Sequence, residues 1–127
     1  IYSDLIKQLY WRDYYYNILY EYPDTISKHI TLKDKFNNII WNDNKLLIKW
    51  EEGKTGFPIV DSAMREMNIT GYMHNRGRLI VSSFLIKTLR IDWKFGEKYF
   101  ATKLIDYDPA QNVGNWNFQL GTLDGAG

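Results

Sequence analysis

The sequence predicts an all-α fold. Apolar residues recur at intervals of three and four over several segments of the 127-residue chain, which is the spacing of a helix with one buried face. No run alternates apolar and polar residues between turn signals, as a half-buried strand does. Pro58 and Gly71 stand where a helix would begin and end, since proline suits the first helical turn and glycine the residue after the last.

Residues 3–22 are expected to form the first helix. Ser3 or Asp4 can cap its start, and Pro23 stops it because proline cannot continue a helix. The apolar residues with helical spacing in this segment are Leu5, Ile6, Leu9, Tyr10, Tyr14, Ile18 and Leu19.

Two less regular stretches lead to the next long helix. Residues 24–44 contain Thr, Asp and Asn and predict short helical turns and loops, and residues 45–51 predict one short helix. A glycine-bounded turn over 51–56 precedes a helix from Pro58 to Gly71. The apolar stripe of that helix is Ile59, Val60, Ala63, Met64 and Met67.

The last third of the chain predicts two helices and an irregular end. Residues 75–89 contain β-branched residues that also suit a strand, but the length of the segment favours a helix. Helical spacing returns over residues 95–105. Residues 106–118 are rich in Asp, Pro, Asn and Gly, and we expect an irregular loop there.

Composition excludes several classes of protein. Hydrophobic residues make up 45% and charged residues 24% of the chain, which suits one globular domain or a piece of a larger one. No apolar run approaches the roughly 20 residues of a membrane span. The absence of cysteine excludes disulfides and thiolate sites, and two histidines are too few for a His-rich metal centre. Aromatic residues reach 17%, and such rings fill cores or stack on flat ligands.

The chain begins at Ile1 without a methionine and ends in a glycine-rich stretch without a capped element. We expect it to be a segment of a longer protein. No signal-peptide pattern is present, so an intracellular location, in the cytoplasm or nucleus, is expected.

Charge is unevenly distributed although the net charge is only +1. Residues 45–103 carry 11 basic and six acidic side chains, and residues 104–127 carry three acidic and no basic ones. A basic middle suits a phosphate-bearing partner, although solvated helix faces explain the same pattern.

Most familiar catalytic motifs are missing. Residues 53–56 lack the full spacing of a phosphate-binding loop and do not follow a strand. No nucleophile triad is present. His29 and His74 have no metal-ligand spacing, and His74 is expected to be a hydrogen-bonded structural residue.

Two polar clusters are candidates for ligand binding. Arg76 and Arg78 stand at a helix start, where the helix dipole opposes positive charge, so an anionic partner is expected. Asp106 and Asp108 can hold an arginine or accept from a ligand, and Asn112 can bond a ring nitrogen. Exposed arginines and a loop with local Asx bonds remain alternatives. Taken singly, Trp41, Trp93 and Trp116 are most simply core or surface residues.

Together these residues resemble the FAD-binding helical domain of the DNA photolyase/cryptochrome family. Matching blocks keep the family's order and spacing across residues 8–118. They are Trp11–Tyr15, Glu52–Asp61, Gly71–Arg78, Ile91–Trp93, Gly96–Phe100 and Asp106–Trp116.

The resemblance implies roles for the cofactor-binding residues. Asn112 matches the asparagine that faces flavin N5 in photolyases. Asp106 and Asp108 match the acidic pair beside the flavin, and Arg78 matches the arginine that pairs with the first of them. Asn75 matches an asparagine that reaches both cofactor and DNA lesion.

It also implies a lesion pocket and an electron path. Gln8, Trp11 and Arg76 match positions that line the lesion pocket or contact DNA. Leu79 stands where a methionine is common, and Phe118 where cyclobutane-specific members usually have a second stacking tryptophan. Trp41, Trp93 and Trp116 match the tryptophans that pass an electron from the surface to photoexcited flavin.

Two further departures concern specificity. The glycine at position 77, between the two arginines, resembles the pattern of the cryptochrome subgroup that prefers single-stranded DNA. Asn75 stands where enzymes for the other pyrimidine lesion typically have histidine, which argues against that specificity.

The resemblance implies light-driven repair of cyclobutane pyrimidine dimers in DNA, with FAD as cofactor and no metal. Residues 1–127 then form part of an FAD-binding domain, without the family's antenna domain, and we expect a monomer that binds dimer-containing DNA. The alternatives are a cryptochrome-like photoreceptor and a truncated, inactive remnant.

Overall fold

The computed structural model describes residues 1–26 and 39–121, and within these ranges the chain forms helices and no strands. The predicted all-α class is therefore confirmed. In chain order the elements are α1 (Tyr2–Glu21), η1 (Pro23–Ile26), α2 (Leu47–Glu51), α3 (Pro58–Thr70), α4 (Asn75–Ser83), the π-helix η3 (Phe84–Thr88), α5 (Trp93–Lys103) and α6 (Pro109–Leu120).

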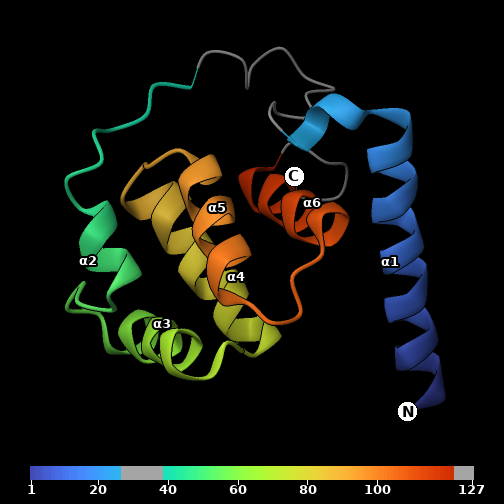
Figure 1. Cartoon of the computed structure of the whole chain (residues 1–127), viewed down its shortest axis with the longest axis horizontal. Coiled ribbons are helices and arrows are strands. Elements are labelled where there is room, and N and C mark those ends of the chain that lie inside the picture. The colour runs from blue at the N-terminus through green and yellow to red at the C-terminus, as the bar shows by residue number, and fades with distance from the viewer. Residues whose placement is uncertain (27–38, 122–127) are drawn as a thin grey trace.

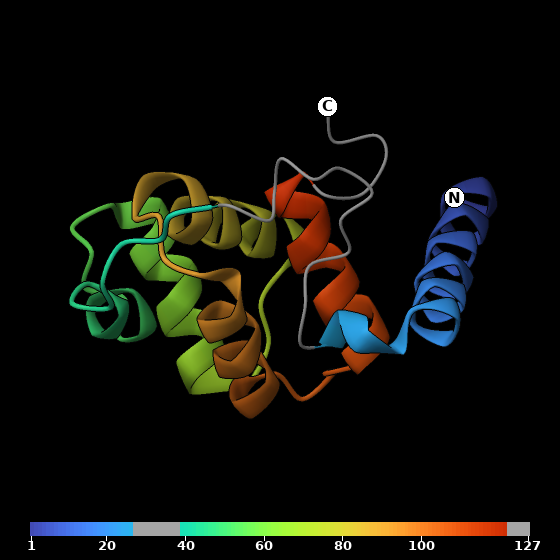
Figure 2. The ribbon, with the colours of Figure 1, turned by 90° about the horizontal axis from the view of Figure 1, so that it is seen from above.

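Helices α2 to α5 form one packed group, and α6 lies between that group and α1 (Figure 1). The view from above shows the same order, with α1 at the far side of α6 (Figure 2). Helix α6 contacts α1, α4 and α5, so it joins the two parts of the molecule. Any site that uses α1 and α4 together must therefore include α6.

The core explains much of the high aromatic content. Trp50, Trp93 and Trp116 are almost fully buried among methionine and aliphatic side chains. Trp50 stacks on Phe100 with ring centroids 6.1 Å apart, and its indole N–H donates to the Val81 carbonyl at 3.0 Å. That bond satisfies the one polar group of a fully buried indole.

Close approach of α5 and α6 depends on Gly96. A Cβ atom there would overlap the Trp116 ring and lie 2.7 Å from Leu85 Cδ2. The glycine thus allows the Trp116 ring to pack directly on the α5 backbone.

The predicted ends of α3 and α5 have clear physical causes. Pro58 occupies the first turn of α3, and Gly71 ends it with φ +72°, a conformation that glycine adopts without strain. Helix α5 begins two residues earlier than predicted, because the Asp92 side chain accepts the Lys94 N–H at 3.1 Å and caps it.

The predicted single helix over 75–89 is two elements. Helix α4 ends at Ser83, and its continuation widens into the π-helix η3. The chain leaves η3 through Arg90, whose φ of +54° is rare for a residue other than glycine.

The expected irregular loop over 106–118 is wrong: residues 109–120 form α6. Pro109 suits a first helical turn, and Asp108 caps it by accepting the Gln111 N–H at 3.0 Å. Asparagine and glycine lower the intrinsic helix propensity of this segment. Burial of Val113, Trp116 and Asn117 overrides it.

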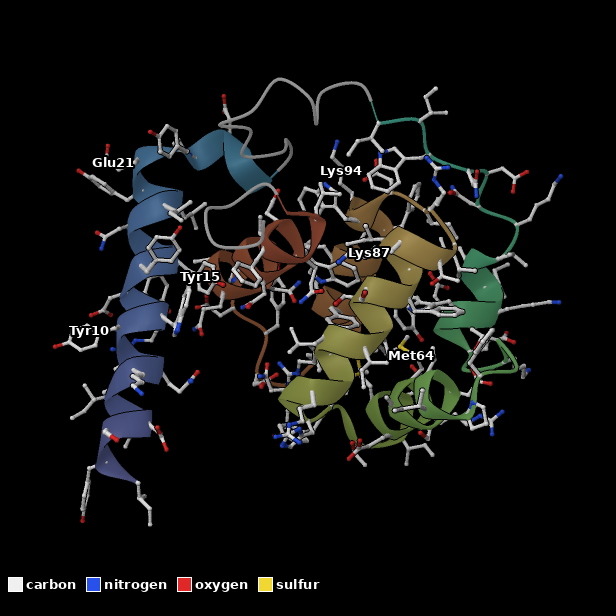
Figure 3. All side chains as sticks on the ribbon, turned by 180° about the vertical axis from the view of Figure 1, so that it is seen from behind. Tyr10, Tyr15, Glu21, Met64, Lys87 and Lys94 are labelled. Atoms are coloured by element: carbon white, nitrogen blue, oxygen red, sulfur yellow. The ribbon has the colours of Figure 1, made fainter. Side chains whose placement is uncertain are left out.

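Helix α1 is present, but the predicted cap by Ser3 or Asp4 is wrong: the helix begins at Tyr2, after Ile1, and no side chain caps it. Most of its apolar side chains are exposed. Tyr15 is its one buried residue, and it points toward α6, whereas Tyr10 and Glu21 point away (Figure 3). The exposed side chains include those of Tyr2, Leu5, Ile6, Leu9, Tyr10 and Tyr20.

Candidate functional site

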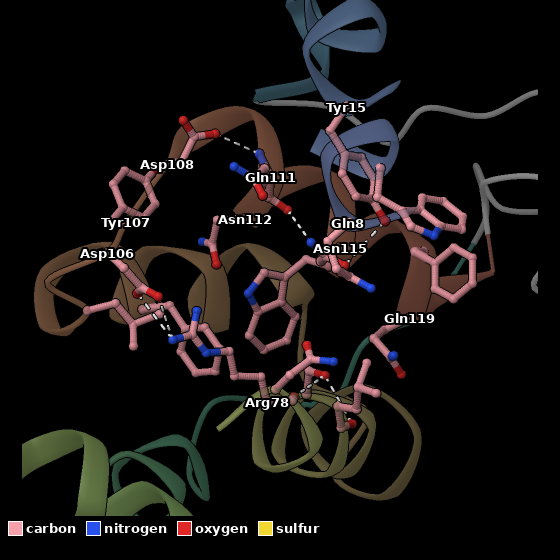
Figure 4. Close-up of a pocket in the computed structure, with 18 residues that line it drawn as sticks. Gln8, Tyr15, Arg78, Asp106, Tyr107, Asp108, Gln111, Asn112, Asn115 and Gln119 are labelled. Carbon is pink, nitrogen blue, oxygen red and sulfur yellow. Dashed lines mark hydrogen bonds and ion pairs between the residues drawn. The ribbon is translucent and has the colours of Figure 1, made fainter. Parts of the chain in front are cut away.

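A cavity of about 370 Å³ lies among α1, α4, α6 and the segment between α5 and α6 (Figure 4). Its volume is within the range of cofactor pockets. It brings together ten residues predicted from sequence: Gln8, Trp11, Asn75, Arg78, Leu79, Asp106, Asp108, Asn112, Trp116 and Phe118. The double-arginine helix and the acidic segment therefore face one concavity.

Arg78 and Asp106 form the polar centre of one wall. One guanidinium nitrogen, Nη2, lies 3.1 and 2.9 Å from the two Asp106 carboxylate oxygens. The Arg78 Nε–H donates to the Met73 carbonyl at 2.7 Å, and its guanidinium lies 5.5 Å from the Tyr72 ring centroid. These contacts fix the guanidinium in place, as a positioned binding group requires.

Asp108 lies at the cavity but already accepts two bonds from the protein. One oxygen caps α6, and the other accepts the Tyr16 hydroxyl at 2.6 Å. The bond to Asp108 is the main reason that the pKa of the Tyr16 hydroxyl is raised. Asp108 thus ties α1 to α6, and its role beside a cofactor stays a prediction.

Asn112 extends into the cavity from α6 (Figure 4). Its amide nitrogen donates to the backbone carbonyl and to the side-chain carboxylate of Glu97, each at 3.3 Å. With the amide N–H groups turned to Glu97, the carbonyl oxygen faces the cavity and is placed to accept a hydrogen bond.

Glu97 does not line the cavity, but it holds Asn112 and Tyr107, which do, and the sequence reasoning missed it. Its carboxylate also accepts the Tyr107 hydroxyl at 2.9 Å. Burial and this bond raise the pKa of Tyr107 to about 12, so Tyr107 remains a neutral donor. Glu97 lies in a block quoted for the family resemblance, which is the signal that could have found it.

Aromatic side chains form the opposite part of the cavity. The Trp11 ring stacks on Tyr15 with centroids 5.9 Å apart and meets Phe118 edge-on at 6.2 Å. Gln8 comes from the same helix, one turn before Trp11. The cavity therefore has an aromatic, apolar part in addition to its polar wall.

Arg76 is absent from the residues that line the cavity and is exposed. Its backbone N–H donates at 3.1 Å to His74 Nδ1, which caps α4. The structural role predicted for His74 is therefore confirmed. Arg76 remains placed to reach a partner outside the cavity.

The three predicted electron-path residues differ in position. Trp116 lines the cavity, Trp93 is fully buried in the core, and Trp41 is half-buried against that core. Trp116 also contacts Phe100 at 5.1 Å and Trp50 at 6.3 Å between ring centroids. Nothing in the sequence distinguished Trp50 as a neighbour of Trp116.

The turn over residues 53–56 holds a carboxylate of its own chain. The N–H groups of Thr55 and Gly56 donate to Asp61 at 2.8 and 2.9 Å, and the Thr55 hydroxyl donates at 2.5 Å. Asp61 therefore takes up the donors that a bound phosphate would need, which agrees with the rejection of a phosphate-binding loop in the sequence analysis.

Two features are absent from the part of the chain that the structure describes. Within it, no three His, Asp or Glu side chains gather as they would around a metal ion. No helix there has the length and apolar character to cross a membrane.

Comparisons with known proteins agree with this geometry. The model of the FAD binding domain of DNA photolyase matches residues 5–126. A deoxyribodipyrimidine photo-lyase of Vibrio cholerae is 45% identical over 92% of this chain and 25% of its own length. A cryptochrome DASH of Natronomonas pharaonis is 47% identical over 92% of this chain and 24% of its own length.

The fold is similar to that of solved relatives. A bacterial class III photolyase from Agrobacterium tumefaciens has a TM-score of 0.93 at 43% identity, over 98% of this chain and 26% of that one. The chain thus spans about a quarter of the length of the curated relatives it matches. Cavity, fold and family model lead to one conclusion: the chain belongs to the photolyase/cryptochrome family, whose FAD-binding-domain model it matches over residues 5–126.

Proposed function

We propose that residues 1–127 form part of the catalytic domain of an enzyme that repairs cyclobutane pyrimidine dimers in DNA with light and reduced FAD. The observation that carries this proposal is that the predicted cofactor residues line the same cavity as all the predicted lesion residues except Arg76. The matching photo-lyases bear that activity in their name.

The residues present fit a flavin ring. Trp116 offers a flat aromatic wall, the Arg78–Asp106 pair offers fixed donors and acceptors, and the Asn112 oxygen is turned to the cavity. When bound and excited by light, reduced FAD supplies the electron that opens the cyclobutane ring. The protein's share is to hold and orient the cofactor and the lesion.

This assignment needs no acid–base triad, because the ring opens after it gains an electron and the electron then returns. The Asn112 amide is neutral, so it adds no charge near the flavin. Its oxygen suits a reduced flavin, whose N5 carries a proton that can be donated.

The lesion must leave the duplex to reach the cavity, and a damaged, weakly stacked pair lowers that cost. Trp11 and Phe118 supply the apolar wall against which flipped pyrimidines can stack. Gln8 and Asn75 can bond the edges of the bases, and Leu79 lines the same cavity. Arg76 is exposed, and its guanidinium can pair with the phosphate backbone.

For the electron path we keep Trp116, Trp93 and Trp41 in that order, from the cavity through the core to its edge. Along this path, electrons from a donor in solution would reduce oxidised flavin. We further propose a monomer without a metal ion, in the cytoplasm or nucleus.

The second candidate is a cryptochrome-like photoreceptor, which binds flavin and signals to partners. Two observations favour it. The sequence is 47% identical to that of a cryptochrome DASH, and Phe118 stands in place of a second stacking tryptophan.

A repair assay distinguishes the photolyase from the photoreceptor and from the inactive remnant. The chain is incubated with reduced FAD and a dimer-bearing oligonucleotide under blue light, and restored pyrimidines are counted by chromatography. Light-dependent repair that Trp11→Ala lowers and Tyr20→Ala leaves unchanged supports the photolyase proposal. Bound flavin without repair favours the photoreceptor, and absence of both favours the inactive remnant.

A further inference from the structure

The outer residue of the proposed electron path lies in a segment without regular secondary structure. Residues 39–44 precede α2 and form neither helix nor strand. Trp41 in this segment is half-buried and packs against the core cluster that contains Trp93. What holds the segment against the core therefore also sets where the Trp41 ring lies.

Asn42 makes two hydrogen bonds to the turn between η3 and α5. Its backbone N–H donates to the Arg90 carbonyl at 2.7 Å. Its side-chain Nδ2–H donates to the Leu89 carbonyl at 3.0 Å. One residue therefore joins the segment to two adjacent carbonyls, which restrains both its position and its rotation.

The turn that accepts these bonds is itself well fixed. Leu89 ends η3, and its N–H donates to the Phe84 carbonyl at 3.0 Å. The positive φ of Arg90 turns the chain, and the Ile91 N–H bonds back to the Leu85 carbonyl at 3.1 Å. Two residues later, Trp93 begins α5 and is fully buried.

The neighbours of Asn42 form no comparable link in the described residues. The Asp43 carboxylate accepts the Lys45 N–H and pairs with the Lys45 ammonium group, both within the segment. The Asn44 carbonyl accepts the Leu47 N–H at the start of α2. Asn44 is thus a matched control: the same residue type, exposed, in the same segment.

We infer that Asn42 is a positioning residue that holds the Trp41 ring against the core cluster that contains Trp93. This inference rests on the proposed function, because it matters chemically only if electrons pass between these two indoles. Each transfer moves one electron from Trp41 to an oxidised Trp93, breaks no bond, and leaves Trp41 to be restored by an added thiol. Electron tunnelling falls steeply with distance, so loss of the side-chain bond from Asn42 to the Leu89 carbonyl, which loosens the segment, slows this step.

The first test uses the flavin-free chain. Acrylamide quenching of tryptophan fluorescence is measured for the native chain, Asn42→Ala and Asn44→Ala, each with Trp41 and with Trp41→Phe. We expect Asn42→Ala to increase the quenching constant assigned to Trp41 by about twofold, and Asn44→Ala to leave it unchanged. An Asn42→Ala protein with native quenching overturns the inference. Far-UV circular dichroism checks that each variant is folded.

The second test measures the rate of flavin photoreduction in the FAD-loaded chain with a thiol donor. Asn42→Ala should slow it toward the rate of Trp41→Phe, and the double variant should be no slower than Trp41→Phe alone. Asn42→Asp has nearly the same volume but places an acceptor against the Leu89 carbonyl, so it should be as slow as Asn42→Ala.

The two tests separate the inference from the function on which it rests. If Trp41→Phe photoreduces at the native rate, Trp41 is not on the path, and both the electron path and the role of Asn42 in it are contradicted. If Trp41→Phe is slow while Asn42→Ala is native in rate, the path stands and the Asn42 inference fails. A chain that takes up no flavin contradicts the proposed function, and the quenching comparison still decides whether Asn42 fixes Trp41.

Discussion

At the scale of single residues, Asp61 links a turn to the helix that follows it. Burial alone raises the pKa of the Asp61 carboxyl, but the hydrogen bonds from Thr55 and Gly56 and the Arg65 charge outweigh it and leave the pKa below its ordinary value. A carboxyl with a lowered pKa stabilises the folded state above its ordinary pKa. That contribution disappears as the pH falls through the lower, folded-state value.

Asp61→Asn should therefore lower the free energy of unfolding at pH 7 by about 1–3 kcal/mol. The new amide N–H group would face the Thr55 and Gly56 groups that donate to the native carboxylate. The difference from the native chain should begin to shrink below about pH 4, where the carboxyl of the unfolded chain becomes protonated, and it should be lost once the pH is below the lower pKa of the folded state. Urea unfolding at pH 7 and pH 3 measures both. Asp4→Asn, on the exposed first turn of α1, is the control. An equal difference at both pH values would contradict the account.

Tyr15 gives the opposite dependence on pH. Burial, with a smaller contribution from Tyr14, raises its pKa to about 12, and its hydroxyl donates to the Asn115 side chain at 3.2 Å. Because the folded state keeps this proton more tightly than the unfolded chain, stability is complete below pH 10 and falls as the pH rises from about 10 to 12.

Tyr15→Phe should cost about 1 kcal/mol at pH 8, for the lost hydrogen bond. It should also make unfolding less sensitive to a rise from pH 8 to pH 11. Thermal unfolding at the two pH values measures this, with exposed Tyr20→Phe as the control. A Tyr15→Phe chain that loses as much stability at pH 11 as the native chain would show that Tyr15 is not the responsible group.

At the scale of elements, α6 shows where sequence reasoning failed. Local propensity over residues 106–118 favours a loop, whereas burial between α1 and α5 makes the segment helical. Asp108 and Pro109 together form a helix start signal, but the Asn and Gly residues that follow made the segment resemble a loop. The helix over residues 109–120 is therefore stabilised by its packing against neighbouring helices rather than by its intrinsic helix propensity.

The cap of α6 can be tested by comparing two substitutions. Asp108→Ala removes the acceptor for the Gln111 N–H and for the Tyr16 hydroxyl, and it should cost about 1–2 kcal/mol. Asp108→Asn keeps an N-cap oxygen and should cost clearly less. Chemical denaturation measures both. Equal losses would mean that the charge of Asp108, rather than its cap, stabilises the helix.

At the scale of the whole molecule, the all-α class and most helices follow from periodicity and from Pro58 and Gly71. The site does not follow in the same way. Its residues come from α1, α4 and α6, far apart in sequence, and family resemblance rather than spacing brought them together. Glu97 and Asn42 were missed because their roles arise from tertiary hydrogen bonds.

The exposed apolar side chains of α1 also belong to this scale. Helical spacing predicts a buried stripe there, yet Tyr15 is the one residue of α1 that the fold buries. Packing against α6 alone covers a narrow strip of the helix. Periodicity indicates that a helix forms, but it does not say how much of its surface the neighbouring elements cover.

The central claim is that the cavity among α1, α4 and α6 holds the flavin. An equilibrium titration of the chain with FAD, followed by flavin fluorescence, tests it most directly. The account predicts saturable one-to-one binding that Arg78→Ala weakens about tenfold or more, since it removes charge-assisted contacts, and that Lys87→Ala, an exposed cation away from the cavity, leaves unchanged. Absence of saturable binding, or equal affinity of both variants, would contradict it.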